Sequence, residues 1–209
     1  MKMKKLKQRK LLIIGAGGIG SYLASFLERI SERGMPLYHI TIYDDDKVEE
    51  KNISYQNYNV EDIGEFKVAA LGGKLGLRSD SIADRREFQV LNEKQLKENY
   101  DLVICCVDNL AARRILYKTG YGEDCPVKWL DLRAQGRMAL LVSYKINPIL
   151  IPDLLAGADG SFSCQGGDWD GSAKDISAMH IAIAGIATQW VQRWFNDNND
   201  VADKMLVNV

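Results

Sequence analysis

The sequence predicts an α/β fold: a Rossmann-like, doubly wound and mostly parallel sheet with flanking helices and a mixed, antiparallel C-terminal extension. Three observations predict it. A glycine-rich turn joins the first apolar run to an amphipathic helix, strand-like and helix-like segments then alternate along the chain, and the region near residues 137–146 is more mixed. We expect a single domain over residues 1–209, since this length suffices for one complete core but hardly for two.

The first element is the apolar run Leu11–Ile14, followed by the sequence Gly-Ala-Gly-Gly-Ile-Gly-Ser. Gly15 lets the chain turn sharply, and Gly20 lets the following helix pack closely on the strand. Gly17 and Gly18 let bare backbone approach a ligand at the helix N-terminus, where unpaired N–H groups favour an anion. The motif therefore predicts a nucleotide-binding βαβ unit, although it does not say which nucleotide is bound.

The remaining elements are read in order from periodicity and from residues that start or end helices. Strands are expected at Tyr38–Tyr43, Glu87–Val90, Asp101–Val107, Val127–Leu132 and Arg137–Ile146, and helices at Ile19–Arg33, Glu65–Leu77, Glu93–Glu98, Leu110–Thr119 and Ile176–Phe195. The run at 101–107 is continuously apolar, as in a buried parallel strand. The helix at 176–195 is apolar nearly all round, which predicts burial on all sides. Residues 156–174 are rich in Gly, Ser and Asp and predict a long flexible loop.

Charge and cysteine content narrow the possible functions. The net charge of −1 offers no electrostatic case for nucleic acid or a membrane surface, and no apolar run is long enough to span a bilayer. Residues 1–10 are basic and are expected to form a solvated leader before the first strand. The four cysteines lack the spacing of a disulfide framework, and Cys105 and Cys106 adjoin in an apolar run. Buried thiols of this kind predict a cytoplasmic protein.

Candidate ligand-binding residues follow three of the predicted strands, at the sheet edge where ligands of such folds bind. One group is the glycine turn itself. Asp44 follows the second strand at the position where an acid bonds a ribose hydroxyl, a placement shared by NAD and adenosine binders, and a solvated acidic loop is its alternative reading. Asp46 could bind a ligand or bond its own backbone within the loop.

The third polar group is Asp108-Asn109, at the tip of the most buried strand. A carboxylate at Asp108 could hold a hydrated Mg²⁺ over the phosphate end of the site, or it could cap the helix that follows. Lys67 falls in the first turn of a predicted helix, where the helix dipole opposes a cation. A ligand anion nearby would account for it, as would simple exposure to solvent.

Taken in order, these residues resemble the ubiquitin-activating-enzyme-like superfamily that includes ThiF and MoeB. The segments that carry the resemblance are Gly15-Ala-Gly-Gly-Ile-Gly-Ser21, Asp44-Asp-Asp-Lys-Val-Glu-Glu-Lys-Asn-Ile-Ser-Tyr-Gln56, Ile63-Gly-Glu-Phe-Lys-Val68 and Val107-Asp-Asn-Leu-Ala-Ala-Arg113. The similarity covers residues 11 to about 146, and the final apolar helix also fits. The combination is far more specific than any one of its parts.

The resemblance implies an ATP-binding site and assigns roles to its residues. Gly18 would line the ATP site with Gly15, Gly17 and Gly20, and Asp44 would bind the ribose. Lys67 would contact phosphate, and Asp108 with Asn109 would lie at the magnesium and phosphate end. Asp46 also belongs to the expected nucleotide-binding set, and three further matches to the pattern, Asn52, Gln56 and Arg113, are weaker candidates.

The family's chemistry is adenylation of the C-terminal glycine carboxylate of a small ubiquitin-fold protein, with release of pyrophosphate. The resemblance therefore implies ATP and Mg²⁺ as ligands, the C-terminal tail of such a protein as partner, and a homodimer. It also places an arginine where this chain has Tyr55, and Lys47, Lys51 or an arginine from a second protomer could replace that cation. Loss of this charge leaves a second reading open, a catalytically degenerate nucleotide-binding or scaffold subunit.

One further departure from the family pattern bears on the chemistry. The paired CxxC motifs of the family are missing, so no structural zinc is expected. Cys164, in the Gly-rich loop, is the remaining candidate for a reactive thiol, with a bystander cysteine as its alternative. A third reading, an NAD-dependent oxidoreductase, would explain the glycine turn and Asp44. It would leave Lys67 and the Asp108-Asn109 pair without a role.

Overall fold

A computed structural model describes residues 9–31, 38–75, 83–84, 100–157, 165, 176–196 and 200–209, and every structural statement below concerns these residues. The expected strand at 87–90, the expected helix at 93–98 and Cys164 lie outside the described residues, as does most of the loop at 156–174.

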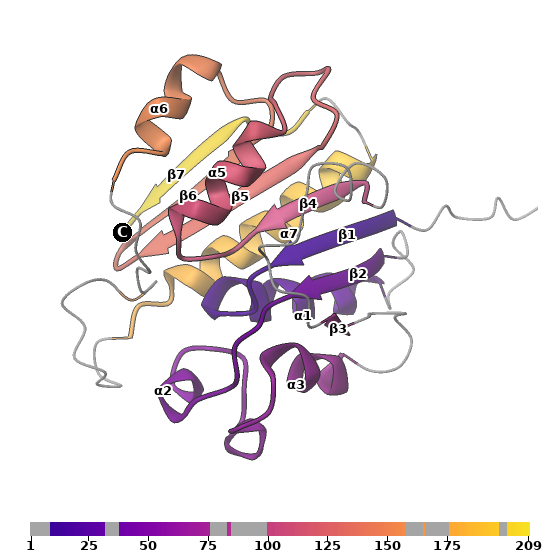
Figure 1. The fold of residues 1–209 in the computed structure, drawn as a ribbon, viewed down its shortest axis with the longest axis vertical. Helices are drawn as coiled ribbons and strands as arrows, with labels where there is room; N and C mark the ends of the chain where they lie inside the picture. The colour runs from indigo at the N-terminus through magenta and orange to yellow at the C-terminus, as the bar shows by residue number, and fades with distance from the viewer. Residues whose placement is uncertain are drawn as a thin grey trace, which may run out of the picture.

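A seven-stranded sheet with the order β3-β2-β1-β4-β5-β6-β7 organises the molecule (Figure 1). Its strands are β1 (Arg9–Ile14), β2 (Tyr38–Tyr43), β3 (Ala83–Asp84), β4 (Leu102–Cys105), β5 (Trp129–Gln135), β6 (Met138–Ser143) and β7 (Lys204–Asn208). The strands from β3 to β5 pair in parallel, whereas β5, β6 and β7 pair antiparallel. The predicted doubly wound sheet and its antiparallel C-terminal extension are confirmed.

Helices flank the sheet on both faces. Helices α1 (Gly18–Ser31) and α7 (Met179–Asn196) pack against each other behind the sheet, and α5 (Leu110–Lys118) crosses in front of β5 and β6 (Figure 1). Five short elements complete the described secondary structure: α2 (Glu50–Ile53), η1 (Val60–Asp62), α3 (Lys67–Lys74), η3 (Pro148–Leu150) and α6 (Ile151–Leu154). Both α2 and α3 lie beyond the β2 side of the sheet, next to the ends of the parallel strands (Figure 1).

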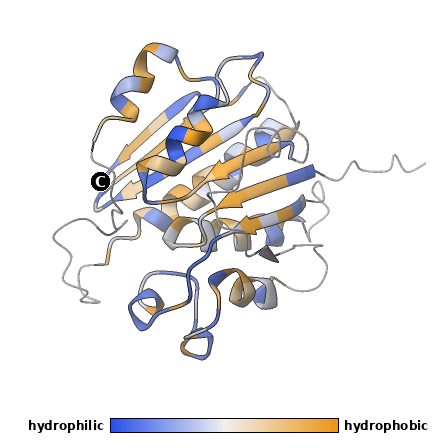
Figure 2. Ribbon diagram, in the orientation of Figure 1, coloured by the Kyte–Doolittle hydropathy of each residue, from blue (hydrophilic) through white to orange (hydrophobic). Residues whose placement is uncertain are grey.

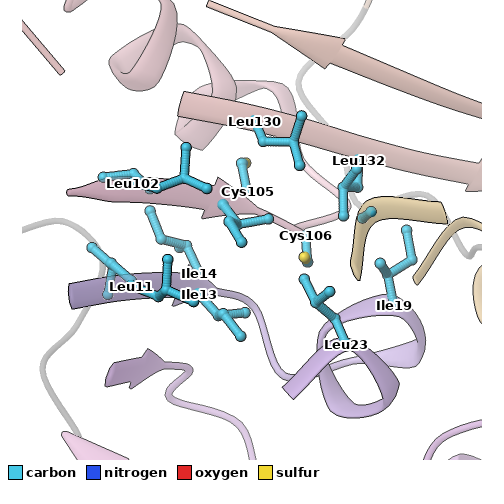
Figure 3. Close-up of a cluster of buried hydrophobic side chains, with 14 of the residues drawn as sticks. Leu11, Ile13, Ile14, Ile19, Leu23, Leu102, Cys105, Cys106, Leu130 and Leu132 are labelled. Carbon is cyan, nitrogen blue, oxygen red and sulfur yellow. The ribbon is translucent and has the colours of Figure 1, made fainter. Parts of the chain in front are cut away.

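The core follows directly from the apolar strands. Strand β4 and the Leu11–Ile14 part of β1 are hydrophobic (Figure 2), and the side chains from Leu102 to Cys105 are fully buried. Figure 3 shows Leu23 of α1 and Leu132 of β5 meeting the end of β4 around Cys106. A continuous apolar strand buries side chains on both faces, which requires helices on both sides of the sheet.

Two sequence-based expectations need correction. Strand β1 begins at Arg9, so the last two residues of the expected leader belong to the sheet, and the Arg9 guanidinium lies 4.9 Å from the centre of the Phe195 ring. Helix α7 is not buried all round. It exposes a stripe that carries Ala182, Gln189 and Arg193, because short and polar side chains suffice where the helix faces away from the sheet.

Strand β7 was not expected from the sequence. Its side chains are mostly exposed, so the alternation that marks a half-buried strand is missing, and its pairing with β6 makes it part of the sheet. No helix in the described ranges is both long and apolar enough to cross a membrane.

Candidate nucleotide site

The glycine turn lies where the ends of three strands meet. The Gly15 N–H donates to the Tyr43 carbonyl at 2.8 Å, and the Cys106 N–H donates to the Ile14 carbonyl at 2.7 Å, so the ends of β1, β2 and β4 are joined. Gly15 has a φ of +93°, and a Cβ there would come within 3.0 Å of the Cys106 backbone. The predicted sharp turn is confirmed, and close approach to the end of β4 is a second reason for glycine.

Gly20 and Gly17 differ in their surroundings. A Cβ on Gly20 would lie 1.8 Å from the Gly15 carbonyl oxygen, so only glycine allows α1 to start this close to the turn. A Cβ on Gly17 would meet no atom within 4 Å, and Gly18 is the first residue of α1. The turn is therefore tight on its sheet side, while its outer side leaves backbone open at the helix N-terminus, as an anion site requires.

The Asp44 carboxylate faces the glycine turn. Its Oδ2 accepts from the Ala16 N–H at 2.6 Å, and its Oδ1 accepts from the Asp46 N–H at 2.9 Å. The hydrogen bond within the acidic loop is therefore accepted by the Asp44 side chain. This corrects the reading in which the Asp46 side chain bonds its own backbone. Burial raises the pKa of Asp44, and Lys67 together with the two N–H donors opposes that shift.

The helix expected at 65–77 begins two residues later, at Lys67, which therefore lies in its first turn as expected and is buried. Its Nζ lies 2.7 Å from Asp46 Oδ2, and Asp46 is exposed. Burial lowers the pKa of Lys67, but the carboxylates of Asp44 and Asp46 outweigh burial and raise it. The side chain therefore carries a positive charge on the Asp44 side of the strand ends. The alternative reading, an exposed lysine, is wrong.

Asp108 and Asn109 connect β4 to α5. The Asn109 side chain accepts from the Ala112 N–H at 3.0 Å and caps α5, so the alternative in which Asp108 caps this helix is wrong. This cap uses the side-chain oxygen, Oδ1, of Asn109, a residue that we expected at the phosphate end. Asp108 is exposed at the strand tip.

The Arg113 side chain, one of the weaker candidates for a nucleotide contact, is bonded within the fold. It is buried, and its Nε donates to Asp131 Oδ1 at 2.9 Å. Its two terminal nitrogens donate to the carbonyls of Val107 and Asn109, on either side of Asp108. Burial lowers the pKa of Arg113, but Asp131 outweighs burial and raises it. Arg113 thus positions the backbone that carries Asp108.

Asp131 is a structural partner of the site that sequence reasoning missed. Its carboxylate is fully buried and also accepts from the Tyr117 hydroxyl at 3.1 Å and from Arg133 at 2.8 Å. The signal was present in the sequence, because a single acid inside the apolar run Val127–Leu132 must be paired when the strand is buried.

Asn52 and Gln56 are both buried on the short segment after β2. Asn52 Oδ1 accepts from the Glu49 N–H at 2.8 Å, as part of the capping box at the start of α2. Gln56 Oε1 has no hydrogen-bond partner among the described residues. An unpaired buried acceptor of this kind keeps Gln56 among the candidate ligand contacts.

Tyr55 lies edge-on to the buried His180 of α7, with ring centres 6.2 Å apart. The two lysines that could replace the missing arginine are engaged elsewhere. Lys51 Nζ pairs with Glu49 at 2.7 Å on the surface, and Lys47 Nζ lies 5.2 Å from the centre of the Phe66 ring. In the described part of the chain, Lys67 is the buried lysine next to Asp44.

The described cysteines are buried and free, and Cys164 lies outside the described residues. Burial raises the pKa of the Cys105 thiol to about 12, so at pH 8 only about one thiol in ten thousand is a thiolate. We expect Cys105 and Cys106 to resist iodoacetamide in the native protein and to react in denaturant. Mass spectrometry of digested samples would test this, and rapid native labelling at either residue would contradict the burial.

Comparison with known proteins shows the family of this chain. Residues 1–143 match the model of the ThiF family, and the chain belongs to that family. The adenylyltransferase and sulfurtransferase UBA4 of Yarrowia lipolytica is 30% identical over 188 residues, which cover 87% of this chain and 46% of that protein. A probable molybdopterin-synthase adenylyltransferase of Gracilaria tenuistipitata is 31% identical over 122 residues, covering 56% of this chain and 33% of that protein. This chain thus spans less than half the length of these relatives.

Solved structures show the same fold. A crystal structure of E. coli MccB superimposes with a TM-score of 0.66 and 17% identity, covering 98% of this chain and 60% of that one. The structure of PaaA gives a TM-score of 0.62 with 19% identity and covers 98% of this chain and 62% of that one. At these identities the likeness concerns the fold alone.

Proposed function

We propose that the chain is an ATP-dependent adenylyltransferase that activates the C-terminal glycine carboxylate of a small ubiquitin-fold protein. The observation that supports this best is the convergence of an open glycine turn, Asp44 and the buried cation Lys67 at one edge of a ThiF-family sheet. The adenylyltransferases among its relatives point in the same direction. We also propose that the protein acts in the cytoplasm as a homodimer.

The residues fit a nucleoside triphosphate. The N-terminus of α1 and the Lys67 ammonium offer positive charge, and the Asp44 carboxylate offers an acceptor for a ribose hydroxyl. The proposed acyl carboxylate attacks the α-phosphorus, a new C–O–P bond forms, and the bond to the β-phosphate breaks to release pyrophosphate. Lys67 would neutralise charge that builds up on the phosphates, which is the main requirement of such a displacement.

We propose Asp108 as the residue whose carboxylate would hold a magnesium ion. This side chain is exposed at the end of β4, and Arg113 fixes the backbone carbonyls on both sides of it. When bound there, Mg²⁺ would supply charge neutralisation at the phosphates. Arg113 contributes by holding the strand tip in place, because its arms tie Val107 and Asn109 to the buried Asp131.

Lys67→Ala is expected to weaken ATP binding. Loss of one charge-assisted contact to phosphate removes about 1.5–3 kcal/mol, or roughly 10–100-fold in the dissociation constant. Calorimetric titration with ATP and Mg²⁺, run beside NADH, would measure this. Lys74→Ala, at the other end of the same helix, is the matched control, since Lys74 pairs with Asp62 outside the site. Tight binding of NADH that ignores Lys67 would overturn the proposal.

A second candidate is a nucleotide-binding or scaffold subunit without catalytic activity. The observation in its favour is Tyr55, whose ring packs on His180, together with Lys47 and Lys51, which are paired elsewhere. Such a subunit would bind ATP but release no pyrophosphate with any ubiquitin-fold protein. An enzyme would release one pyrophosphate for each acyl-adenylate formed, so a coupled pyrophosphate assay with candidate partners separates the two.

A further inference from the structure

The ion pair between Lys67 and Asp46 has a specific setting. Lys67 Nζ is 2.7 Å from Asp46 Oδ2, and the lysine side chain is 8% exposed whereas the aspartate side chain is 66% exposed. The buried end of the pair is therefore the cation, and its partner reaches in from the solvent side. A lone surface pair would contribute little, but here one member is a candidate phosphate contact.

Backbone hydrogen bonds fix the same two residues. The Lys67 N–H donates to the Asp46 carbonyl at 2.9 Å, and the Val48 N–H donates to the Glu65 carbonyl at 2.8 Å. The segment after β2 is thus paired with the segment that leads into α3. These backbone hydrogen bonds hold Asp46 and Lys67 next to each other independently of the ion pair between their side chains.

The pair is also connected to the glycine turn. The Ala16 N–H donates to Asp44, and Asp44 in turn accepts from the Asp46 N–H. A continuous chain of hydrogen bonds therefore runs from the turn through both aspartates to the Lys67 ammonium. This chain sets where the ammonium lies relative to the turn.

We propose that Asp46 is a positioning residue, which holds the Lys67 side chain in the orientation that meets the phosphates of the nucleotide. This inference rests on the proposed function. A lysine ammonium has three N–H donors, so it can keep its bond to Asp46 while it donates to a phosphate. Free lysine side chains lose substantial rotamer entropy when they bind, and an orientation already held by Asp46 avoids that loss.

The opposing effect is repulsion between the Asp46 carboxylate and a phosphate. Because Asp46 is exposed, solvent and salt screen this repulsion, whereas the ordering of a lysine side chain does not depend on screening. We therefore expect Asp46→Ala to weaken ATP binding about tenfold. Simple electrostatics predicts tighter ATP binding instead, since removing an acidic side chain should favour the binding of a polyanion.

The test is a double-mutant cycle by calorimetry, with Asp46→Ala, Lys67→Ala and the double variant titrated with ATP and with adenosine. Asp46→Ala should weaken ATP binding and leave adenosine binding within about twofold, and it should have no further effect when Lys67 is absent. Asp45→Ala is the matched control, because Asp45 is the adjacent exposed residue of equal charge. Repeating the titrations without Mg²⁺ separates positioning, which persists, from binding of the metal by Asp46.

Three results would overturn the inference: ATP binding that is unchanged or tighter in Asp46→Ala, a loss that persists in the Lys67→Ala background, or a loss seen only with Mg²⁺. An equal loss of adenosine binding would show a structural role and would also overturn it. Failure of the unmodified protein to bind ATP would instead overturn the proposed function, so the two failures are distinct.

Discussion

Gly20→Ala is expected to lower the free energy of unfolding by at least about 3 kcal/mol. The added Cβ would lie 1.8 Å from the Gly15 carbonyl oxygen, and the atom it meets is backbone that cannot rotate away. Gly15 in turn rests against the Cys106 backbone, so neither the turn nor the helix can shift without disturbing β4. Urea denaturation followed by circular dichroism would measure the change.

Gly17→Ala is the control for this experiment. The same added atom at Gly17 would meet nothing within 4 Å, and it is not a positive-φ glycine. We expect the free energy of unfolding to change by less than about 1 kcal/mol. Equal stability losses in the two variants would show that the glycine turn is not packed against β4 as described.

Asp131→Asn is expected to destabilise the protein by about 3–5 kcal/mol, because it leaves two guanidiniums without their buried counter-charge. Asp131 is fully buried and bonded to Arg113, Arg133 and the Tyr117 hydroxyl. The change is isosteric, so it alters charge and not packing volume. Because Arg113 also holds the carbonyls around Asp108, we expect binding of Mg²⁺ and ATP to weaken in the folded fraction.

The matched comparison is Asp200→Asn, which breaks the exposed pair between Arg193 and Asp200. Solvent screens both charges, so the free energy of unfolding should change by less than about 0.5 kcal/mol. Thermal and urea unfolding of the two variants would test the contrast. An Asp131→Asn protein as stable as the Asp200→Asn protein would show that the buried network does not stabilise the fold.

Local pattern was sufficient where a residue's role is local. The apolar run at 11–14 and its glycines predict the turn, since φ and Cβ contacts depend on neighbours in sequence and on the adjacent strand. Strand Tyr38–Tyr43 was predicted to the residue, and Lys67 lies in the first turn of a helix as expected. Strand β7 was missed, because an exposed strand acquires its structure from pairing with β6.

The same contrast between local pattern and tertiary contacts applies to the candidate site. The family pattern, the glycine turn and the acids at the strand ends could be predicted from the sequence, because they follow from residue type and spacing. The orientation of the charged side chains could not be predicted, because it depends on contacts between distant segments. Arg113 matches the family pattern as closely as Lys67 does, yet it turns inward to Asp131, which lies 18 residues later in the chain. The orientation of a buried charged side chain depends on a partner elsewhere in the fold, because an unpaired ion cannot remain in the core. The spacing of residues in the sequence does not reveal that partner.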